Sequence, residues 1–121
     1  MSVHAQRAME RLKEAILTLG DLAEASVREA IRALQERNYH LALRVIEEDT
    51  QIDDLEVDIE EECLKFLALY QPVAADLRFV VAVLKINNDL ERVGDLAVNI
   101  SERVAFLARD PPPATPFDFQ D

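Results

Sequence analysis

Two acidic pairs in the sequence have the spacing of ligands on one face of a helix. Asp49 and Asp53 are four residues apart, and so are Glu91 and Asp95. Side chains four apart lie one turn from each other on the same side of a helix. Carboxylate oxygens are the ligands that hard cations prefer, namely Mg²⁺, Ca²⁺, Mn²⁺ and ferric iron. The two pairs could therefore form the two halves of a cation site.

Further oxygen-bearing side chains flank both pairs. Beside the second pair they are Asn88, Asn99 and Glu102, and beside the first they are Glu56 and Glu60. Like charges one turn apart repel by roughly 0.2 to 0.5 kcal/mol in an isolated helix. Acidic lines that face each other across an interface also have raised pKa values unless a cation compensates. A bound cation would remove this penalty.

The acidic lines are also compatible with a plain solvated surface. Glu and Asp on the outside of a long helix usually only face water, and the spacing alone favours that interpretation. Gly94, inside the second pair, indicates close approach of a neighbouring helix or of a ligand. His4 and His40 lie away from both lines, so we interpret them as surface residues, and the chain lacks the Glu-x-x-His pairs of di-iron bundles.

A line of cations lies in the same segment as the second pair. Arg78, Lys85 and Arg92 are seven residues apart. Such a line can supply partners for nearby acids of the same helix, which is the favoured interpretation, or it can form a site for phosphate or a protein partner.

Three long helices are expected to position these side chains. Apolar residues recur at steps of three and four over residues 4–37, 39–70 and 72–109, which is typical of helices packed along one side. The short connections force neighbouring helices to run antiparallel. We therefore predict an all-α, up-down-up antiparallel three-helix bundle over residues 1–110. The proline-rich residues 111–121 are expected to form a linker or tail, which suggests a further unit.

Caps and breaks divide the three stripes. Gly20 falls inside the first stripe without shifting its phase, so we expect one continuous helix there. Asn38 is the expected cap of the second helix, and Pro72 is expected to end that helix and to stand in the first turn of the third. The first stripe is Met9, Leu12, Ile16, Leu19, Ala23, Val27, Ala30 and Leu34, the second is Val45, Ile52, Leu55, Ile59, Cys63 and Phe66, and the third is Phe79, Val83, Ile86, Leu90, Val93, Ala97, Ile100, Val104 and Leu107.

Composition limits the class of protein. The chain has 121 residues, enough for one domain, and a formal net charge of -11, which disfavours a nucleic-acid backbone as a partner. It shows no signal-peptide core and no apolar run of the roughly 20 residues that a membrane span needs. Cys63 is the single cysteine, so no internal disulfide can form, and we expect its side chain to be buried. These features predict a cytoplasmic protein.

One stretch resembles a known family. The sequence QPVAADLRFVVAVLKINNDLERVGDLAVNI closely resembles the PhoU family of phosphate-uptake regulators, and VIEEDTQIDDLEVDIEE matches that family in register. The resemblance implies a three-helix unit that usually occurs twice in one chain. Only one such unit is present, so we expect either a truncated two-unit protein or a single-unit form. A missing second unit would leave an apolar flank, and we expect a homo-oligomer to cover it.

The resemblance also implies a role for metal. Family members carry Glu/Asp-x-x-x-Asp motifs that bind metal ions, and Asp49-Thr-Gln-Ile-Asp53 and Glu91-Arg-Val-Gly-Asp95 match them. These four carboxylates become the predicted ligands, whereas the flanking Asn88, Asn99 and Glu102 are supported only by their place on the same face. The identity of the ion, among iron, manganese, magnesium and calcium, stays open.

Regulation rather than catalysis is what the resemblance implies. PhoU-like proteins are expected beside the phosphate ABC transporter ATPase and a sensor histidine kinase, at the cytoplasmic face and without crossing the membrane, where they hold the phosphate-starvation response off. The chain has no Gly-rich phosphate loop that would bind ATP. Two other hypotheses stay open. One is a structural or oligomerising bundle with solvated acidic faces, and the other is a metal-dependent phosphohydrolase, which would need a base or an arginine beside the acidic ligands.

Overall fold

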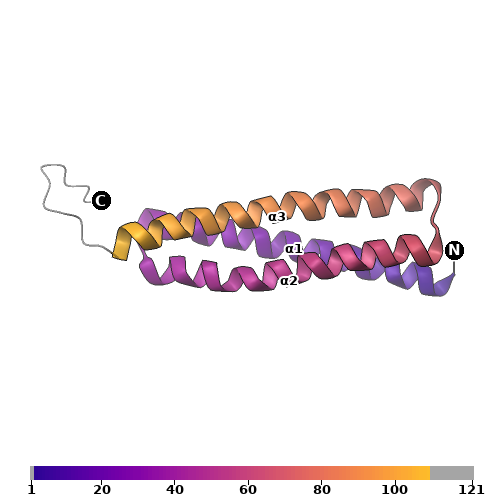
Figure 1. Cartoon of the computed structure of the whole chain (residues 1–121), viewed down its shortest axis with the longest axis horizontal. Helices are drawn as coiled ribbons and strands as arrows, with labels where there is room; N and C mark the ends of the chain where they lie inside the picture. The colour runs from indigo at the N-terminus through magenta and orange to yellow at the C-terminus, as the bar shows by residue number, and fades with distance from the viewer. Residues whose placement is uncertain (1, 110–121) are drawn as a thin grey trace, which may run out of the picture.

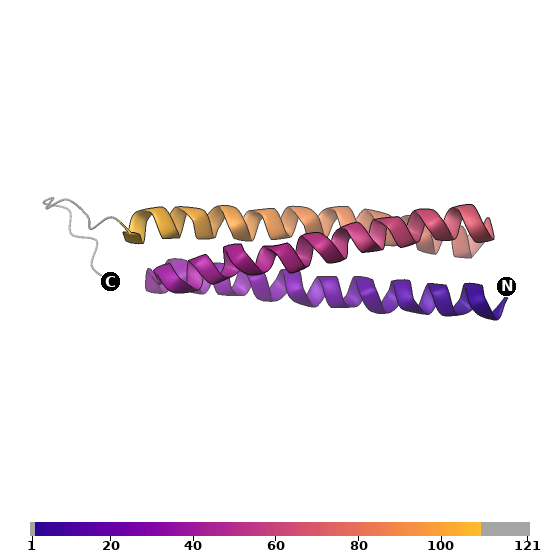
Figure 2. The ribbon, with the colours of Figure 1, turned by 60° about the horizontal axis from the view of Figure 1, so that its bottom comes forward.

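The computed structural model describes residues 2–109, which form three long helices packed side by side (Figure 1). Helix α1 spans Val3–Glu36, α2 spans Tyr39–Tyr70 and α3 spans Ala74–Arg109. The chain runs along the bundle, back, and along it again, and all three pairs of helices are in contact (Figure 2). This confirms the predicted antiparallel three-helix bundle. The predicted linker or tail, residues 111–121, lies outside the described residues.

Side-chain caps begin the first two helices. The hydroxyl of Ser2 accepts a hydrogen bond from the backbone N–H of Ala5 at 3.1 Å, and the Asn38 side chain accepts one from the N–H of Leu41 at 3.0 Å. The predicted Asn38 cap is thus confirmed. The first helix ends one residue earlier than predicted, because Arg37 adopts a left-handed conformation with φ 51° and caps the helix instead of extending it.

The third helix begins at Ala74, so the prediction that Pro72 stands in its first turn is wrong. Gln71 adopts a left-handed conformation with φ 44° and closes α2. Pro72 and Val73 form the connection between α2 and α3. A connection is needed because it must span the distance between the axes of two antiparallel helices. The Val73 carbonyl accepts a hydrogen bond from the N–H of Asp76 at 3.2 Å, which starts the new helix.

The two halves of the core differ in side-chain size. Gly20 does not interrupt α1, as predicted, so the apolar side of that helix runs through both halves. Around the N-terminus of α1 the buried side chains are mostly large, and they are Ala5, Leu12, Ile16, Leu19, Ile52, Ile59, Cys63, Phe66, Val80 and Val83. Toward the opposite end they are mostly small, and they are Ala30, Ala33, Leu41, Ala42, Val45, Ala97 and Val104. Burial of Cys63 is confirmed.

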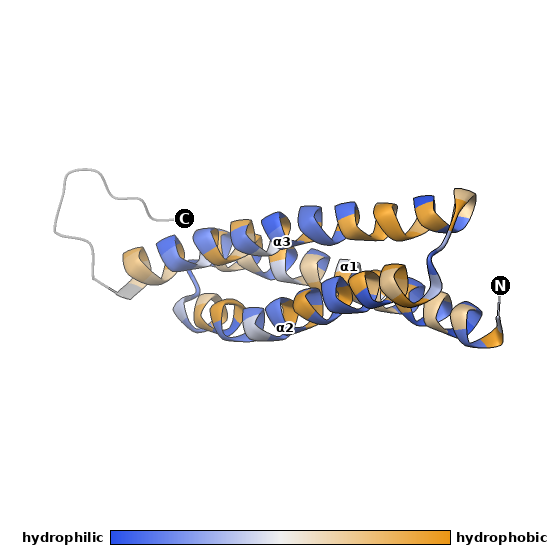
Figure 3. Ribbon diagram, turned by 45° about the vertical axis from the view of Figure 1, so that its right-hand side comes forward, coloured by the Kyte–Doolittle hydropathy of each residue, from blue (hydrophilic) through white to orange (hydrophobic). Residues whose placement is uncertain are grey.

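Apolar and polar residues alternate along every helix, as expected of amphipathic helices (Figure 3). Each helix turns its apolar side toward the other two and its polar side toward solvent. No helix within residues 2–109 is long and apolar enough to cross a membrane.

Three predicted core residues lie outside the core. Leu34 is 53% exposed, Ile86 is 45% exposed and Leu107 is 68% exposed. The buried side of α3 combines three members of the predicted stripe, Val83, Ala97 and Val104, with a second inward line that was not predicted, namely Val80, Asn87, Gly94 and Ser101. This line was missed because two of its members are polar and one has no side chain, so a pattern of large apolar residues selects the neighbouring line. The buried side of α3 is therefore centred between the predicted stripe and this second line.

Candidate metal centre

The two predicted acidic pairs meet across the interface between α2 and α3. Asp49 is half-buried, whereas Asp53, Glu91 and Asp95 are exposed. The carboxyl group of Asp49 lies within electrostatic reach of both Asp53 on its own helix and Asp95 on α3. The structure thus brings acids from both pairs into one region.

Gly94 is the point of closest approach between the two helices. A Cβ atom added to Gly94 would lie 3.4 Å from Oδ1 of Asp49 and 3.4 Å from Cγ2 of Ile52. That separation is already tight, so a larger side chain would push α2 away. The predicted close approach at Gly94 is confirmed, and it involves both a packing contact with Ile52 and a predicted ligand, Asp49.

The carboxyl group of Asp49 is in an unfavourable place for a charge. Its Oδ1 is buried and has no hydrogen-bond partner within the described part of the chain. Burial is the main cause that raises the pKa of Asp49 to about 6, followed by repulsion from Asp53 and Asp95. Without a compensating positive charge, this carboxyl group accepts a proton more readily than an exposed Asp.

Glu56 is a fifth acid of the same region, and the sequence analysis had named it, with Glu60, only as a side chain flanking the first pair. It is 8% exposed, and its Oε2 has no hydrogen-bond partner among residues 2–109. Burial raises the pKa of Glu56 to about 8, with further contributions from a hydrogen bond and repulsion by Glu91 and from repulsion by Asp53 and Asp95. A signal existed in the sequence, because Glu56 completes the three-and-four spacing of the buried α2 residues from Ile52 onward.

Asn87 supports this region from α3. Its Nδ2 donates a hydrogen bond of 3.0 Å to the backbone carbonyl of Glu56, whereas its Oδ1 has no partner in the described structure. The neighbouring Asn88, which was the predicted candidate, is exposed. The heptad line Val80, Asn87, Gly94 and Ser101 would have indicated that Asn87 points inward.

Asn99 and Glu102 lie further along α3 and are not part of this cluster. Both are exposed, and both line an open groove of about 680 Å³ together with Arg103, Phe106 and Leu107. Neither is among the groups that shift the pKa of Asp49 or Glu56. The structure therefore concentrates the acidic site at the two predicted pairs and Glu56.

The residues of this region have the donor atoms that a hard cation needs, although their side chains are too far apart in this structure to surround one. Within residues 2–109, no three His, Cys, Asp or Glu side chains are gathered closely enough to hold a metal ion. The fit rests on the chemistry of the donors: every side chain is an oxygen ligand, and two buried oxygens, of Asp49 and Glu56, lack partners. The exposed carboxylates stand beside them on both helices and can change rotamer.

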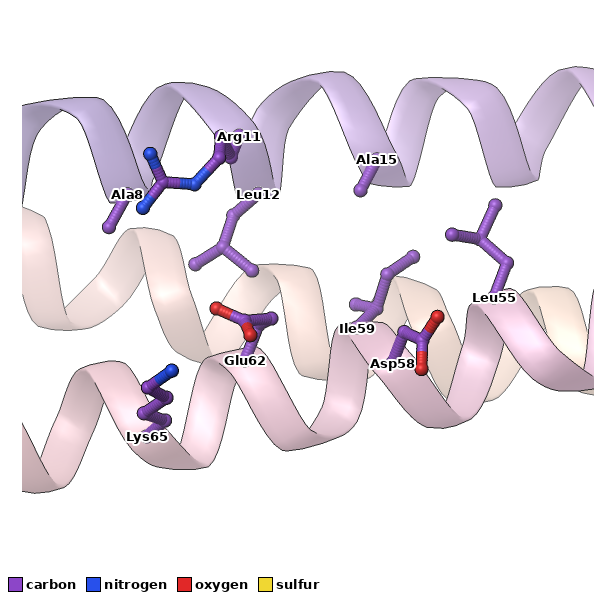
Figure 4. A pocket seen from close by; sticks show the side chains of 9 residues that line it. All are labelled: Ala8, Arg11, Leu12, Ala15, Leu55, Asp58, Ile59, Glu62 and Lys65. Atoms are coloured by element: carbon purple, nitrogen blue, oxygen red, sulfur yellow. The ribbon is translucent and has the colours of Figure 1, made fainter.

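A separate cavity of about 310 Å³ lies between α1 and α2 (Figure 4). Arg11 comes from α1, and Asp58, Glu62 and Lys65 come from α2. Both signs of charge line this cavity, so it favours neither anions nor cations as ligands. All of its lining residues come from α1 and α2, so it is separate from the α2–α3 interface.

The line of cations on α3 lies on the solvent side of that helix. Arg78, Lys85 and Arg92 are all exposed. Arg92 approaches Asp89 at 3.9 Å, with both side chains more than 70% exposed. Arg78 and Lys85 have no ion pair in the described part of the chain, so the interpretation as intrahelical partners holds only for Arg92.

The fold and the acidic interface define an antiparallel helical bundle with paired carboxylates between its second and third helices. A sequence pattern described as the PhoU domain matches residues 16–104 of this chain. The chain belongs to the PhoU family, as its sequence predicted.

Known relatives match the chain along most of its length. It is 45% identical over 106 residues to a phosphate-specific transport system accessory protein PhoU homolog of Aquifex aeolicus, covering 88% of this chain and 48% of the relative. It is 39% identical over 108 residues to PhoU homolog 1 of Thermotoga maritima, covering 89% and 47%. The bundle is similar to the crystal structure of PhoU from Pseudomonas aeruginosa, with a TM-score of 0.83 and 38% identity, over 86% of this chain and 50% of that one. The chain thus spans about half the length of these relatives.

Proposed function

We propose that this chain is a non-enzymatic regulator of phosphate uptake whose α2–α3 interface binds a hard metal cation. The observation that carries the proposal is the half-buried Asp49, whose unpartnered oxygen lies against Gly94 and beside acids of both helices. The relatives named as accessory proteins of a phosphate-specific transport system support the regulatory part. The ion is iron, manganese, magnesium or calcium, because the donors are all oxygens.

The proposed ligands divide between the two helices. Asp49 and Asp53 would hold the ion from α2, and Glu91 and Asp95 from α3, with Glu56 as a buried neighbour. The bound ion would supply positive charge that compensates the repulsion among these acids. Binding would therefore hold α2 and α3 in a fixed position relative to each other. In this way a bound ion could change the position of the outer faces of both helices.

A structural bundle without metal is the second candidate, and one observation favours it. Glu56 and Glu91 are close enough for a hydrogen bond between them, so a shared proton can relieve part of the repulsion without any ion. In that case the exposed acids would serve only as solvated surface.

Metal content distinguishes the two candidates. The double variant Asp49→Asn/Asp95→Asn should bind little or no metal after loading with Mn²⁺ or iron, while its helical circular dichroism stays unchanged. The matched control is Asp58→Asn/Asp89→Asn, which removes the same charge from the same two helices at exposed positions. Elemental analysis should find metal in the wild type and in the control. Absence of metal from the wild type would favour the structural candidate.

We further propose cytoplasmic partners for this regulator, namely the phosphate ABC transporter ATPase and its sensor histidine kinase. The relatives are named as accessory proteins of a phosphate-specific transport system, which supports association with such a system. Co-purification of each partner with the tagged chain, with and without Mn²⁺, tests the proposal. Failure of both partners to bind under both conditions would contradict it.

Self-association is the last part of the proposal. Large apolar side chains remain exposed on the outer faces of the bundle, among them Val57 at 52%, Leu64 at 53% and Leu77 at 40%. Exposed apolar groups that repeat along a helix are typical of a surface that is covered in the assembled protein. A homo-oligomer would cover them, and sedimentation velocity of the purified chain tests for it.

A further inference from the structure

The cations on the outside of α3 form a regular line that the proposed metal site does not use. Arg78, Lys85 and Arg92 each stand two residues before a buried member of the inward line, namely Val80, Asn87 and Gly94. Two residues correspond to about 200° around a helix, so this line points almost directly away from the core. Over 14 residues it extends for about 21 Å along the bundle.

Helix α2 carries an acidic line of the same period and length. Glu47, Asp54 and Glu61 are exposed, and each stands two residues after a buried apolar residue, namely Val45, Ile52 and Ile59. This line also points outward and also extends for about 21 Å. None of the three acids has an ion pair within residues 2–109, so the line is available to a partner.

Some exposed apolar side chains stand beside the charges of both lines. On α2, Val57 follows Asp54 by three residues and is 52% exposed, and Leu64 follows Glu61 by three and is 53% exposed. On α3, Val81 follows Arg78 by three residues and is 37% exposed. Steps of three and four are the pattern of a helix that packs against another helix. The two lines of charge are therefore opposite in sign, and exposed apolar groups stand beside the charges on both; on α3, Arg92 also approaches the exposed Asp89.

We propose that the outer face of α2 in one copy of this chain packs against the outer face of α3 in a second copy. The inference rests on the proposed self-association and names its contact surface. An antiparallel arrangement, like that of α2 and α3 inside the bundle, pairs Glu47 with Arg92, Asp54 with Lys85 and Glu61 with Arg78.

A second copy fits this face better than a nucleic acid or an anionic membrane does. A chain with a net charge of -11 is repelled by both polyanions, whereas the acidic α2 line matches the cations in sign, period and length. Every copy offers one face of each kind. The contact is therefore heterologous, and repeated copies form a ring or an open chain.

Charge reversal tests the contact by sedimentation velocity. The α3-reversed chain carries Arg78→Glu, Lys85→Glu and Arg92→Glu, and the α2-reversed chain carries Glu47→Lys, Asp54→Lys and Glu61→Lys. Each should self-associate on the order of 100-fold more weakly than the wild type, because three attractive pairs become repulsive. An equimolar mixture should regain association, since the basic α2 face of one chain meets the acidic α3 face of the other.

A matched control reverses three exposed cations on α1, by Lys13→Glu, Arg28→Glu and Arg32→Glu. This control should associate like the wild type, and circular dichroism should show full helicity in every variant. A monomeric wild type would overturn both this inference and the proposed self-association. If the wild type associates and the reversed chains associate equally well, only this inference fails. An open groove between α1 and α3, lined by Val27, Ile31, Leu90 and Val93, is then the alternative contact, and Ile31→Glu should dissociate the chains.

Discussion

The end of the bundle around Phe66 and the α2–α3 interface around Gly94 are built from different kinds of residues. Around Phe66, three helices contribute large apolar side chains that are almost fully buried. Around Gly94, α2 and α3 bury polar side chains. Four buried side-chain atoms lack hydrogen-bond partners in the described structure, and they belong to Asp49, Glu56, Asn87 and Ser101. Apolar burial stabilises a fold, whereas unpartnered polar groups destabilise it.

This contrast indicates where the fold is held and where a ligand can act. A region that is already satisfied gains nothing from an added ion. The region around Gly94 has acids with raised pKa values and unpartnered oxygens, so added positive charge or added protons will stabilise it. Stability and the proposed function therefore belong to adjacent parts of the same two helices.

The largest expected effect comes from the apolar region. Phe66 is 2% exposed, so Phe66→Ala should lower the free energy of unfolding by about 3 to 5 kcal/mol through lost burial and a new cavity. Leu69→Ala is the control on the same helix, because Leu69 is 63% exposed, and its effect should stay within about 0.5 kcal/mol. Urea denaturation measures both. Equal losses in the two variants would show that the core is not centred on Phe66.

The next effect depends on pH and lies in the polar region. The pKa of Glu56 is raised from 4.5 to about 8, so the folded state holds a proton there that the unfolded state releases. The stabilisation is complete below pH 4.5 and is lost as the pH rises toward 8. In metal-free protein, Glu56→Gln should therefore exceed the wild type in stability by about 1 to 2 kcal/mol above pH 8, and match it near pH 4.5.

Denaturation of both proteins at several pH values measures this difference. The control is Glu60→Gln, an exposed position one turn further along α2, which should show no such trend. A constant difference between Glu56→Gln and the wild type at all pH values would contradict the buried, protonated state of Glu56.

The two glycines provide the smallest and sharpest comparison. A Cβ at Gly20 would meet only Leu90 Cδ1 at 4.0 Å, which is an ordinary contact, so Gly20→Ala should stabilise the protein by about 0.5 to 1 kcal/mol. At Gly94 the same Cβ would meet Asp49 and Ile52 at 3.4 Å. Gly94→Ala should therefore gain less than Gly20→Ala, and Gly94→Leu should destabilise the protein by about 1 to 3 kcal/mol. Equal gains for the two alanine variants would show that α2 yields freely at Gly94.

Local signals in the sequence predicted the architecture well. Steps of three and four located three helices, Asn38 was the expected cap, and Gly20 was expected inside a continuous helix. These features depend on residues close together in the chain. The start of α3 was misplaced because the left-handed conformation of Gln71 was not evident from its residue type, and Pro72 was therefore assigned to the helix rather than to the connection.

The candidate site was predicted in part. Acids of both motifs lie in one region between α2 and α3, whereas the burial of Glu56 and of Asn87 was not predicted. Both are polar residues in buried positions, and a hydropathy pattern places polar residues outside. What holds Asn87 inside is a hydrogen bond to the backbone of Glu56, 31 residues earlier, and no local pattern reports such a distant contact.

The central claim is that a hard cation compensates the acids between α2 and α3. Urea denaturation near neutral pH, with and without Mn²⁺, tests it most directly, because a ligand that binds only the folded state stabilises it by about 2.7 kcal/mol at 100 times its dissociation constant. Mn²⁺ should stabilise the wild type and Asp58→Asn/Asp89→Asn, and it should leave Asp49→Asn/Asp95→Asn unchanged. The account is contradicted if Mn²⁺ stabilises Asp49→Asn/Asp95→Asn as much as the wild type, or if Mn²⁺, iron, Mg²⁺ and Ca²⁺ all leave the wild type unchanged.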